Sequence, residues 1–332
     1  MTLWRAARAL GAGLLATAAL SIVGCADREP AAADAPEIAF SILSAQGQAS
    51  AAPLWQPLLD DLGAAVGAKV RPHFASSYSA LVEDMKAGRT QAGWFSAGPA
   101  VEAIDEAGAE MIARTIGLDG GDRYHALLIV RRGSGLDLER VLECPGDLSF
   151  GAADPRSTSG ALALSTFLFN SRRIDPERCF EAVRTGNHEQ NAAQVASGVL
   201  AVAASNTATL EALRLRSPDL ADQIEVIWRS PPLPEGGILI RGDLDPALKE
   251  KIRSFFLTYG QGAGGDAERR RRVLAGLRYS RFSAADDDYL DPVREMMADQ
   301  TLAAARRRGD AAAATAAEGE LQRLRAKREV LP

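Results

Sequence analysis

Short runs of consecutive apolar residues alternate along the chain with longer stretches in which apolar residues recur at helical spacing. In the first part of the chain the apolar runs cover residues 37–43, 69–74, 92–95, 111–114 and 124–130. The amphipathic stretches between them cover residues 53–66, 78–87 and 100–108. A buried strand gives a continuous apolar run, whereas a one-sided helix repeats its apolar residues about every 3.6 positions. The alternation predicts an α/β fold with helices on both faces of a doubly wound, mostly parallel sheet.

A second series with the same alternation follows Gly133-Ser134-Gly135, so we expect two lobes. Its predicted strands cover residues 148–151, 201–204, 224–228 and 237–241. The expected domains are residues 37–132 for lobe 1, residues 133–235 for lobe 2 and residues 236–300 for a return to lobe 1. The crossings near residues 131–135 and 230–237 would form a hinge, and a ligand cleft would lie between the strand ends of the two lobes.

The C-terminal part of the chain differs from these lobes. From Tyr289 onward the pattern is helical, but after Ala303 there are too few apolar residues for a core helix. We therefore expect residues 301–332 to form an exposed or partner-packing helical extension.

The N-terminus has the pattern of an export signal. Two arginines precede an apolar run over residues 9–23 that is short for a membrane-spanning helix. The ending Ile22-Val23-Gly24-Cys25 resembles a bacterial lipobox, in which Cys25 would carry the lipid. We therefore expect a lipoprotein signal peptide over residues 1–24, a flexible tether over residues 25–36 and a periplasmic protein anchored to the membrane by lipid. An ordinary secretory signal with an incidental cysteine is the alternative.

Composition excludes several classes of function. The chain has 332 residues, of which 47% are hydrophobic, and a net charge of -5, so it can bury a substantial core. An acidic chain without a basic block argues against nucleic acid as a partner. Its three histidines are scattered and form no cluster with cysteine, so no metal site and no cofactor are expected.

Two cysteines remain besides the predicted lipid carrier. Cys144 precedes the strand at residues 148–151, and Cys179 precedes the apolar segment at residues 180–183. Consecutive parallel strands of a doubly wound lobe start at the same edge, so the two sulfurs could meet. In an oxidising compartment they would form a disulfide or remain two separate buried thiols, and both possibilities stay open.

The strongest candidate for chemistry is Asp154-Pro155-Arg156-Ser157-Thr158-Ser159-Gly160, which links the strand at residues 148–151 to a helix over residues 161–169. Three hydroxyl side chains fall where the helix exposes unpaired N–H groups and carries partial positive charge. Such a place binds a tetrahedral oxyanion without an arginine. Simple helix capping is the alternative, because Ser and Thr are common N-cap residues.

Two further segments share this arrangement of a strand followed by a helix with a polar first turn. They are Ser76-Ser77-Tyr78 and Asn187-His188. The three segments together could direct N–H and O–H groups at one ligand from opposite walls of the cleft. Taken alone, His188 would be a capping or surface residue, and Tyr78 a packing residue.

Taken together, these segments resemble the phosphonate-binding proteins of phosphonate ABC transporters, the PhnD-like periplasmic binding family with its two-lobe type II fold. The most specific motif is the Asp-Pro-x-Ser-Thr-Ser-Gly sequence of residues 154–160. Supporting segments include Gly186-Asn187-His188-Glu189 and Ser205-Asn206-Thr207. The resemblance extends over roughly residues 37–300.

The resemblance implies a ligand site. In that family an oxyanion group is held by a Ser-Thr-Ser run, a histidine and two tyrosines. The matching residues here are Tyr78, Tyr124, Ser157, Thr158, Ser159 and His188. Hydroxyl, imidazole and N–H donors suit a phosphonate, whose oxygens offer several acceptor sites.

The resemblance also implies a difference at the other end of the ligand. Family members that bind aminoalkylphosphonates hold the ammonium group with carboxylates, and the matching positions here are Ala208 and Gly236. An ammonium buried without an acid is costly, so we expect an amine-free ligand. Glu235, next to the second position, is the alternative acid.

The expected function is that of a substrate-binding lipoprotein of an ABC importer. It would capture a phosphonate or a related phosphorus oxyanion, such as phosphate or phosphite, by hinge closure and deliver it to the permease. A ligand-sensing lipoprotein of the same fold is the alternative. An exported hydrolase using Ser157 or Ser159 with His188 is disfavoured, because the sequence has no Gly-x-Ser-x-Gly elbow and no acid evidently placed to orient the histidine. The chain is therefore not expected to be an enzyme.

Overall fold

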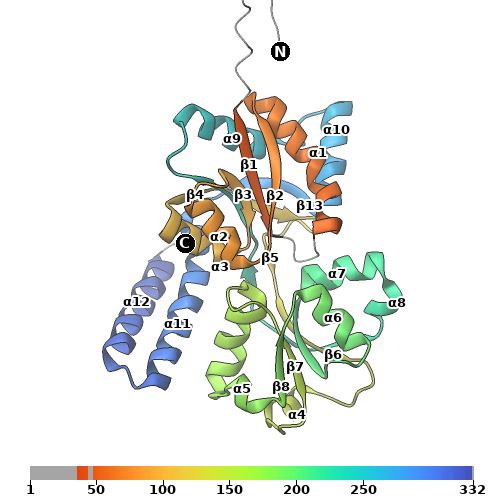
Figure 1. The fold of residues 1–332 in the computed structure, drawn as a ribbon, viewed down its shortest axis with the longest axis vertical. Helices are drawn as coiled ribbons and strands as arrows, with labels where there is room; N and C mark the ends of the chain where they lie inside the picture. Colours follow the sequence, from red (N-terminus) through yellow and green to blue (C-terminus); the bar gives the residue numbers. More distant parts are fainter. Residues whose placement is uncertain (1–35, 44–47, 331–332) are drawn as a thin grey trace, which may run out of the picture. The chain divides into compact units, whose positions relative to one another are not determined.

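The computed structural model describes residues 36–43 and 48–330. The predicted signal peptide, Cys25 and all but the last residue of the predicted tether lie outside the described residues. The described chain folds around two larger β-sheets flanked by helices (Figure 1), which confirms the predicted two-lobe α/β fold. Within these residues, no helix combines the length and apolar character that crossing a membrane requires.

The sheet of lobe 1 has the strand order β13-β4-β12-β3-β1-β2. Its strands are β1 (Glu37–Leu43), β2 (Lys69–Ala75), β3 (Ala92–Phe95), β4 (Ala109–Gly117), β12 (Gly237–Arg241) and β13 (Tyr279–Ala284). Its helices are α1 (Gln48–Val66), α2 (Tyr78–Lys86), α3 (Ala97–Ala107), α9 (Pro246–Thr258) and α10 (Gly265–Gly276). In β12, Ile238 and Ile240 join the core that contains α1 and α9, whereas Leu239 joins the core that contains α2 and α3. Since successive strand residues face opposite sides, helices cover both faces of this sheet.

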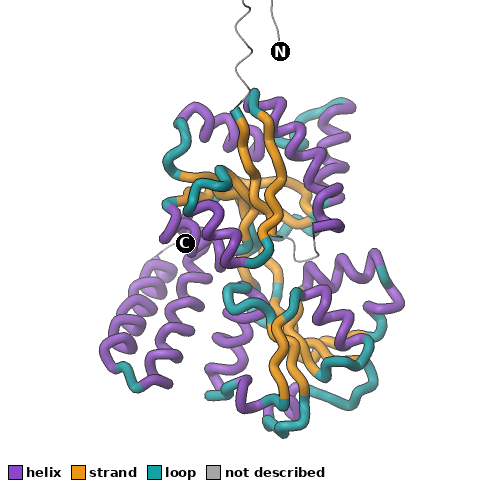
Figure 2. Tube along the Cα trace, in the orientation of Figure 1, coloured by secondary structure: helices purple, strands orange, loops and turns teal. Residues whose placement is uncertain are grey.

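The sheet of lobe 2 has the strand order β10-β6-β9-β7-β8. Its strands are β6 (Ala126–Arg131), β7 (Ser149–Ala152), β8 (Ala182–Thr185), β9 (Val202–Asn206) and β10 (Ile224–Arg229). Its helices include α4 (Leu138–Leu142), α5 (Pro176–Cys179), α6 (His188–Ala196), α7 (Thr207–Arg216) and α8 (Pro218–Ala221). Leu128 and Val130 of β6 belong to one core cluster and Leu127 and Ile129 to another. Helices and strands therefore form the same layers in both lobes (Figure 2).

The chain crosses between the lobes through a small two-stranded sheet. β5 (Arg123–Tyr124) pairs antiparallel with β11 (Leu233–Pro234). β11 lies within the second predicted crossing, at residues 230–237. The first, at residues 131–135, is wrong: β6 pairs with β9 and β10 and so belongs to lobe 2. An apolar strand pattern shows that a strand is buried but not which sheet it joins.

The sheets are mixed rather than mostly parallel. β1 pairs parallel with β2 and β3, and β7 pairs parallel with β8 and β9. β12 and β6, the two strands that directly follow the crossings, pair antiparallel with their neighbours. Both start at the hinge, where the parallel strands β3 and β9 end, so they run in the opposite direction.

The C-terminal extension is a helical hairpin that packs on itself. α11 (Asp291–Arg308) and α12 (Ala311–Val330) lie side by side (Figure 1), and Gly309 makes the turn with a φ of 70°. Buried residues shared by both helices are Ala298, Leu302, Ala317, Leu321 and Leu324. The hairpin starts at Asp291, before the predicted boundary at residue 301. A few well-spaced apolar residues are enough for α12 to pack on α11, while most of the other residues of α12 are exposed or half-buried.

Cys144 and Cys179 form a disulfide. Cys144 precedes β7 and Cys179 ends α5 just before β8, so the bond ties together the starting ends of two neighbouring parallel strands. The opposite ends of these strands lead to Ser157-Thr158-Ser159 and Asn187-His188. The disulfide therefore fixes the base of the strands that position both segments.

Candidate ligand-binding site

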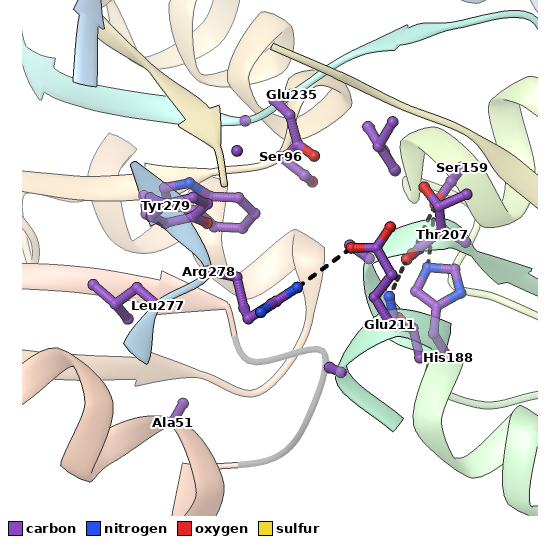
Figure 3. Close-up of a pocket in the computed structure, with 18 of the residues that line it drawn as sticks. Ala51, Ser96, Ser159, His188, Thr207, Glu211, Glu235, Leu277, Arg278 and Tyr279 are labelled. Carbon is purple, nitrogen blue, oxygen red and sulfur yellow. Dashed lines mark hydrogen bonds and ion pairs between the residues drawn. The ribbon is translucent and has the colours of Figure 1, made fainter. Parts of the chain in front are cut away.

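A cavity of about 550 Å³ lies between the two lobes (Figure 3). It is lined by residues from the strand ends and helix starts of both lobes, as the fold predicted. The structure brings all six candidate oxyanion-binding residues to this cavity. We call them the polar end: Tyr78, Tyr124, Ser157, Thr158, Ser159 and His188.

The Ser-Thr-Ser run of the polar end starts a helix of unusual geometry. Thr158–Ala163 and Ser165–Phe169 form π-helical turns where an α-helix was predicted, and such turns often occur at functional sites. Ser157 is the N-cap, because its Oγ accepts a hydrogen bond from the N–H of Gly160 at 3.1 Å. The capping interpretation therefore applies to Ser157.

The other two hydroxyls have different partners. Thr158 Oγ1 accepts a hydrogen bond at 2.7 Å from the N–H of Gly98, which belongs to lobe 1. Ser159 Oγ accepts one at 3.3 Å from the side-chain amide of Asn206. Both residues are at most 2% exposed. They are buried polar groups held in place by hydrogen bonds rather than caps.

His188 starts α6 behind the N-cap Asn187 and is only 3% exposed. Its Nε2 lies 3.3 Å from Ser157 Oγ and 3.4 Å from Ser159 Oγ. Burial lowers the pKa of His188 to about 4, against a smaller opposing effect from the backbone of Ala204. The imidazole is therefore neutral at pH 7 and exchanges hydrogen bonds with hydroxyls, and the described residues give it no carboxylate partner.

The close approach of His188 depends on a glycine. A Cβ added at Gly160 would lie 2.8 Å from His188 Cε1 and 2.2 Å from the Cβ of Ala153. No side chain fits in that space. The glycine that closes the Ser-Thr-Ser motif thus lets the imidazole reach the hydroxyls.

Two tyrosines complete the polar end from the other side. Tyr78 starts α2 after the N-cap Ser77 and shares a hydrogen bond with the Ser157 side chain. Tyr124 lies in the hinge strand β5 and shares hydrogen bonds with Ser159 and Thr158. Burial raises the pKa of both phenols, so they remain neutral O–H groups. Two elements outside lobe 2 therefore meet the Ser-Thr-Ser run at one place.

Sequence reasoning missed Ser96 as a lining residue of the cavity. Ser96 directly follows β3 and is the N-cap of α3, but its side chain makes no capping hydrogen bond. Its buried Oγ has no hydrogen-bond partner among the described residues, and neither has Nε1 of the neighbouring Trp94. The signal was available, because Ser96 follows a strand and precedes a helix just as Ser77 does.

Ala208 and Gly236 both line the cavity, and the surroundings of Gly236 leave no space for a side chain. A Cβ at residue 236 would lie 2.4 Å from the Phe95 carbonyl oxygen and 2.5 Å from the Trp94 ring. This backbone position cannot carry an acid, so its lack of one says nothing about the ligand. Glu235 supplies a carboxylate instead, and Figure 3 shows its side chain extending into the cavity.

The surroundings of Glu235 disfavour its charge. Burial raises its pKa to about 7, and Asp119, Glu211 and Asp122 act in the same direction, whereas the backbone of Gly236 opposes them. The described residues give Glu235 no ion pair with a basic side chain. Glu211, one turn after Ala208 in α7, does have a partner, because its Oε2 lies 3.6 Å from Arg278 Nη2 across the cavity (Figure 3).

Contacts on both sides of the cavity join the lobes. Besides the Gly98–Thr158 hydrogen bond, Arg156 of lobe 2 pairs with Glu102 of lobe 1 at 2.9 Å and contacts the Ser79 hydroxyl. On the opposite side, Arg278 of lobe 1 pairs with Glu211 of lobe 2. The cavity thus lies between two sets of interlobe contacts, as in a closed two-lobe protein.

The fold and this cavity define a class of protein: a type II binding protein that encloses a small ligand between two hinged α/β lobes. The family model described as "ABC transporter, phosphonate, periplasmic substrate-binding protein" matches residues 40–290. The chain belongs to this family of periplasmic substrate-binding proteins of phosphonate ABC transporters.

Individual relatives agree with this assignment. The phosphonates-binding periplasmic protein of Escherichia coli is 34% identical over 270 residues, which cover 80% of this chain and 78% of the relative. The crystal structure of the binding-protein component of a Pseudomonas aeruginosa ABC phosphonate transporter is 33% identical, with a TM-score of 0.83, and covers 89% of this chain and all of that one. A Prochlorococcus marinus protein in complex with methylphosphonate shares the fold at 18% identity, with a TM-score of 0.69 over 82% of this chain and 98% of that one.

Proposed function

We propose that the polar end binds the phosphorus oxyanion of the ligand, with Tyr78, Tyr124, Ser157, Thr158, Ser159 and His188 as its hydrogen-bonding residues. The observation that carries this proposal is that these side chains and the start of a helix, from separate parts of the chain, meet at one end of one cavity. Oxyanions are bound well by O–H and N–H donors at helix starts. A phosphonate fits first, with phosphate and phosphite as smaller alternatives that present similar oxygens.

The polar end is suited to binding rather than to catalysis. His188 is neutral and contacts hydroxyls, whereas a hydrolytic triad needs an acid that orients the histidine. Uncharged donors can hold an anion tightly and still release it when the lobes separate. We therefore propose no catalytic role for Ser157, Ser159 or His188.

Ligand capture would follow from rotation about the hinge strands β5 and β11. Tyr124 lies in one of these strands and contacts the Ser-Thr-Ser run. Closing the lobes therefore brings the tyrosines of one side to the hydroxyls of the other, with the ligand between them. The Arg156–Glu102 and Arg278–Glu211 pairs would form in the same movement.

Glu235 is proposed as the group that faces the substituent on phosphorus. A buried carboxylate without a basic partner is unfavourable, and an ammonium group on the ligand would supply that partner. This reverses the expectation drawn from Ala208 and Gly236, because residue 236 has no room for an acid and the adjacent residue lines the cavity. An aminoalkylphosphonate would then be held at both ends.

The proposal includes delivery to an ABC permease and attachment to the membrane. Family membership supports the first, and the Ile22-Val23-Gly24-Cys25 sequence supports a lipid on Cys25. Mass spectrometry of the mature protein checks the second point. A mature N-terminus elsewhere, with Cys25 unmodified, would contradict it.

Calorimetric titration of the purified protein tests the site. Phosphate, phosphite, methylphosphonate and aminoethylphosphonate are titrated into the wild type and into Thr158→Ala and His188→Ala. Each substitution should weaken phosphonate binding by about 1.5–3 kcal/mol, the range for a hydrogen bond to a charged group, which is roughly 10- to 150-fold in Kd.

Matched controls are Thr315→Ala on α12 and His73→Ala on β2, both outside the cavity. They should bind the ligand as the wild type does. If the Thr158 and His188 variants also bind normally but melt markedly lower, these residues are structural and the site assignment fails.

A further inference from the structure

The cavity is much larger than a phosphonate group. Its volume is about 550 Å³, whereas a water molecule occupies about 30 Å³ in the liquid. A phosphonate with a methyl substituent has the bulk of only a few water molecules. Even with the polar end filled, most of the cavity is left for something else.

Apolar side chains form part of the remaining wall, beside the charged residues Asp119, Glu211, Arg216 and Arg278. These apolar residues, which we call the apolar compartment, are Ala51, Leu54, Trp55, Leu118, Ala212 and Leu215. They come from α1 and the segment after β4 in lobe 1 and from α7 in lobe 2. Both lobes therefore contribute apolar side chains to the same space.

The exposure of these leucines is informative. Five large hydrophobic side chains stand out as exposed in the described part of the chain, and three of them are Leu54, Leu118 and Leu215. Single exposed hydrophobic residues are ordinary, but an apolar surface gathered around a cavity marks a binding site. Leu215 is 67% exposed although it lines the cavity, so it gains most from a ligand that covers it.

Closure of the lobes does not account for this space. The lobes already touch at Gly98–Thr158 on one side and at Arg278–Glu211 on the other. The apolar compartment thus stays open while both sides of the cleft are bridged.

We infer that the apolar compartment takes an apolar substituent on the phosphorus atom, so that the ligand class is organophosphonates with several carbon atoms beyond the headgroup. This rests on the proposed function, since the polar end must hold the phosphorus oxyanion. The headgroup lies against Ser157-Thr158-Ser159, and the carbon chain runs toward Leu215.

Titration with methyl-, ethyl-, butyl- and hexylphosphonate tests this inference. A buried methylene contributes about 0.8 kcal/mol, roughly a 4-fold change in Kd. Butylphosphonate should therefore bind the wild type at least ~10-fold tighter than methylphosphonate. The gain should level off where the chain reaches solvent.

We call the factor by which butylphosphonate binds tighter than methylphosphonate the butyl-to-methyl ratio. Leu215→Ser and Leu118→Ser should reduce this ratio to less than about 3-fold, because a hydroxyl replaces the apolar contact. Val199→Ser is the matched control, since Val199 is also exposed but lies outside the cavity. It should leave the ratio unchanged. A full ratio retained in Leu215→Ser and Leu118→Ser would place the chain elsewhere and overturn the inference.

Two further outcomes are distinguishable. If methylphosphonate binds but butylphosphonate binds equally or more weakly, the apolar compartment does not take the substituent and the inference is wrong while the proposed function stands. If no phosphonate of any length binds, the proposed function itself fails, and the inference with it.

Discussion

The polar end and the apolar compartment of one cavity are built in different ways. At the polar end, Ser157, Thr158, Ser159 and His188 are at most 3% exposed and hydrogen-bond to one another or to their neighbours. In the apolar compartment, Leu54, Leu118 and Leu215 are between 37% and 67% exposed. Pre-ordered donors bind without paying much ordering entropy, whereas loosely packed apolar side chains adapt to what covers them. Under the proposed function, this difference would give the polar end the affinity for the headgroup, and would give the apolar compartment, together with Glu235, the choice of substituent.

Removing the disulfide is expected to have the largest effect on stability. The bond lies at the starting ends of the strands that lead to the polar end. In Cys144→Ser/Cys179→Ser the loop of 35 residues is no longer closed, which should lower the free energy of unfolding by about 4 kcal/mol. Because β7 and β8 carry the segments that lead to Ser157 and His188, headgroup binding should weaken more than the butyl-to-methyl ratio changes.

Unfolding in denaturant measures the free energy of unfolding, and the wild type with its disulfide reduced is the control. Reduced wild type and the double variant should unfold alike. A loss of less than about 1 kcal/mol in the variant would show that the bond contributes much less than the chain-entropy model predicts.

Gly160→Ala should have the next largest effect, because the added methyl group displaces residues of the polar end. Its Cβ would collide with Ala153 and with the imidazole of His188, and such overpacking costs about 1–3 kcal/mol. Thermal unfolding and phosphonate titration should both show the loss. Gly319→Ala on α12 is the control, since a Cβ there meets nothing within 4 Å and alanine favours a helix by up to ~1 kcal/mol. Equal stability of the two variants would contradict the packing argument.

Residues of the polar end could largely be predicted from the sequence, because the start of a helix has a local sequence pattern. Turns with polar residues between a strand and a helix indicated Ser157, Thr158, Ser159, His188 and Tyr78. Ser96 carried the same signature and was overlooked. Tyr124 was inferred from the family resemblance alone, because its position depends on the hinge.

Features that depend on which residues become neighbours in the folded chain were harder to predict from the sequence. Nothing in the sequence around residues 126–131 says that this strand pairs with β9 and β10 and not with β4. The absence of an acid at residue 236 was misleading, because Phe95 and Trp94 occupy the space where its side chain would lie. The apolar compartment could not be predicted from the sequence, because its leucines come from three separate segments that meet only in the folded chain.

Glu235, which faces the substituent on phosphorus in the proposed function, provides the smallest of these effects. At pH 8, above its pKa of about 7, the carboxylate is charged and should favour an ammonium group on the ligand. At pH 6 it is mostly protonated, so the preference should shrink as the pH falls through 7. Ethylphosphonate is the reference matched in size. Because the ammonium group makes the phosphonate of aminoethylphosphonate more acidic, the ionisation of each free ligand is measured separately and its contribution is subtracted.

The measurement that tests the account most directly is a cycle of two ligands and three proteins at pH 8. Aminoethylphosphonate and ethylphosphonate are titrated into the wild type, Glu235→Gln and His188→Ala. The division of roles predicts that the wild type prefers the amine by at least ~10-fold, about 1.4 kcal/mol. Glu235→Gln should abolish the preference, and His188→Ala should weaken both ligands equally while keeping it. A preference for ethylphosphonate in the wild type, or a ratio that His188→Ala changes as much as Glu235→Gln does, would contradict the division of roles between the polar end, which holds the headgroup, and Glu235, which faces the substituent.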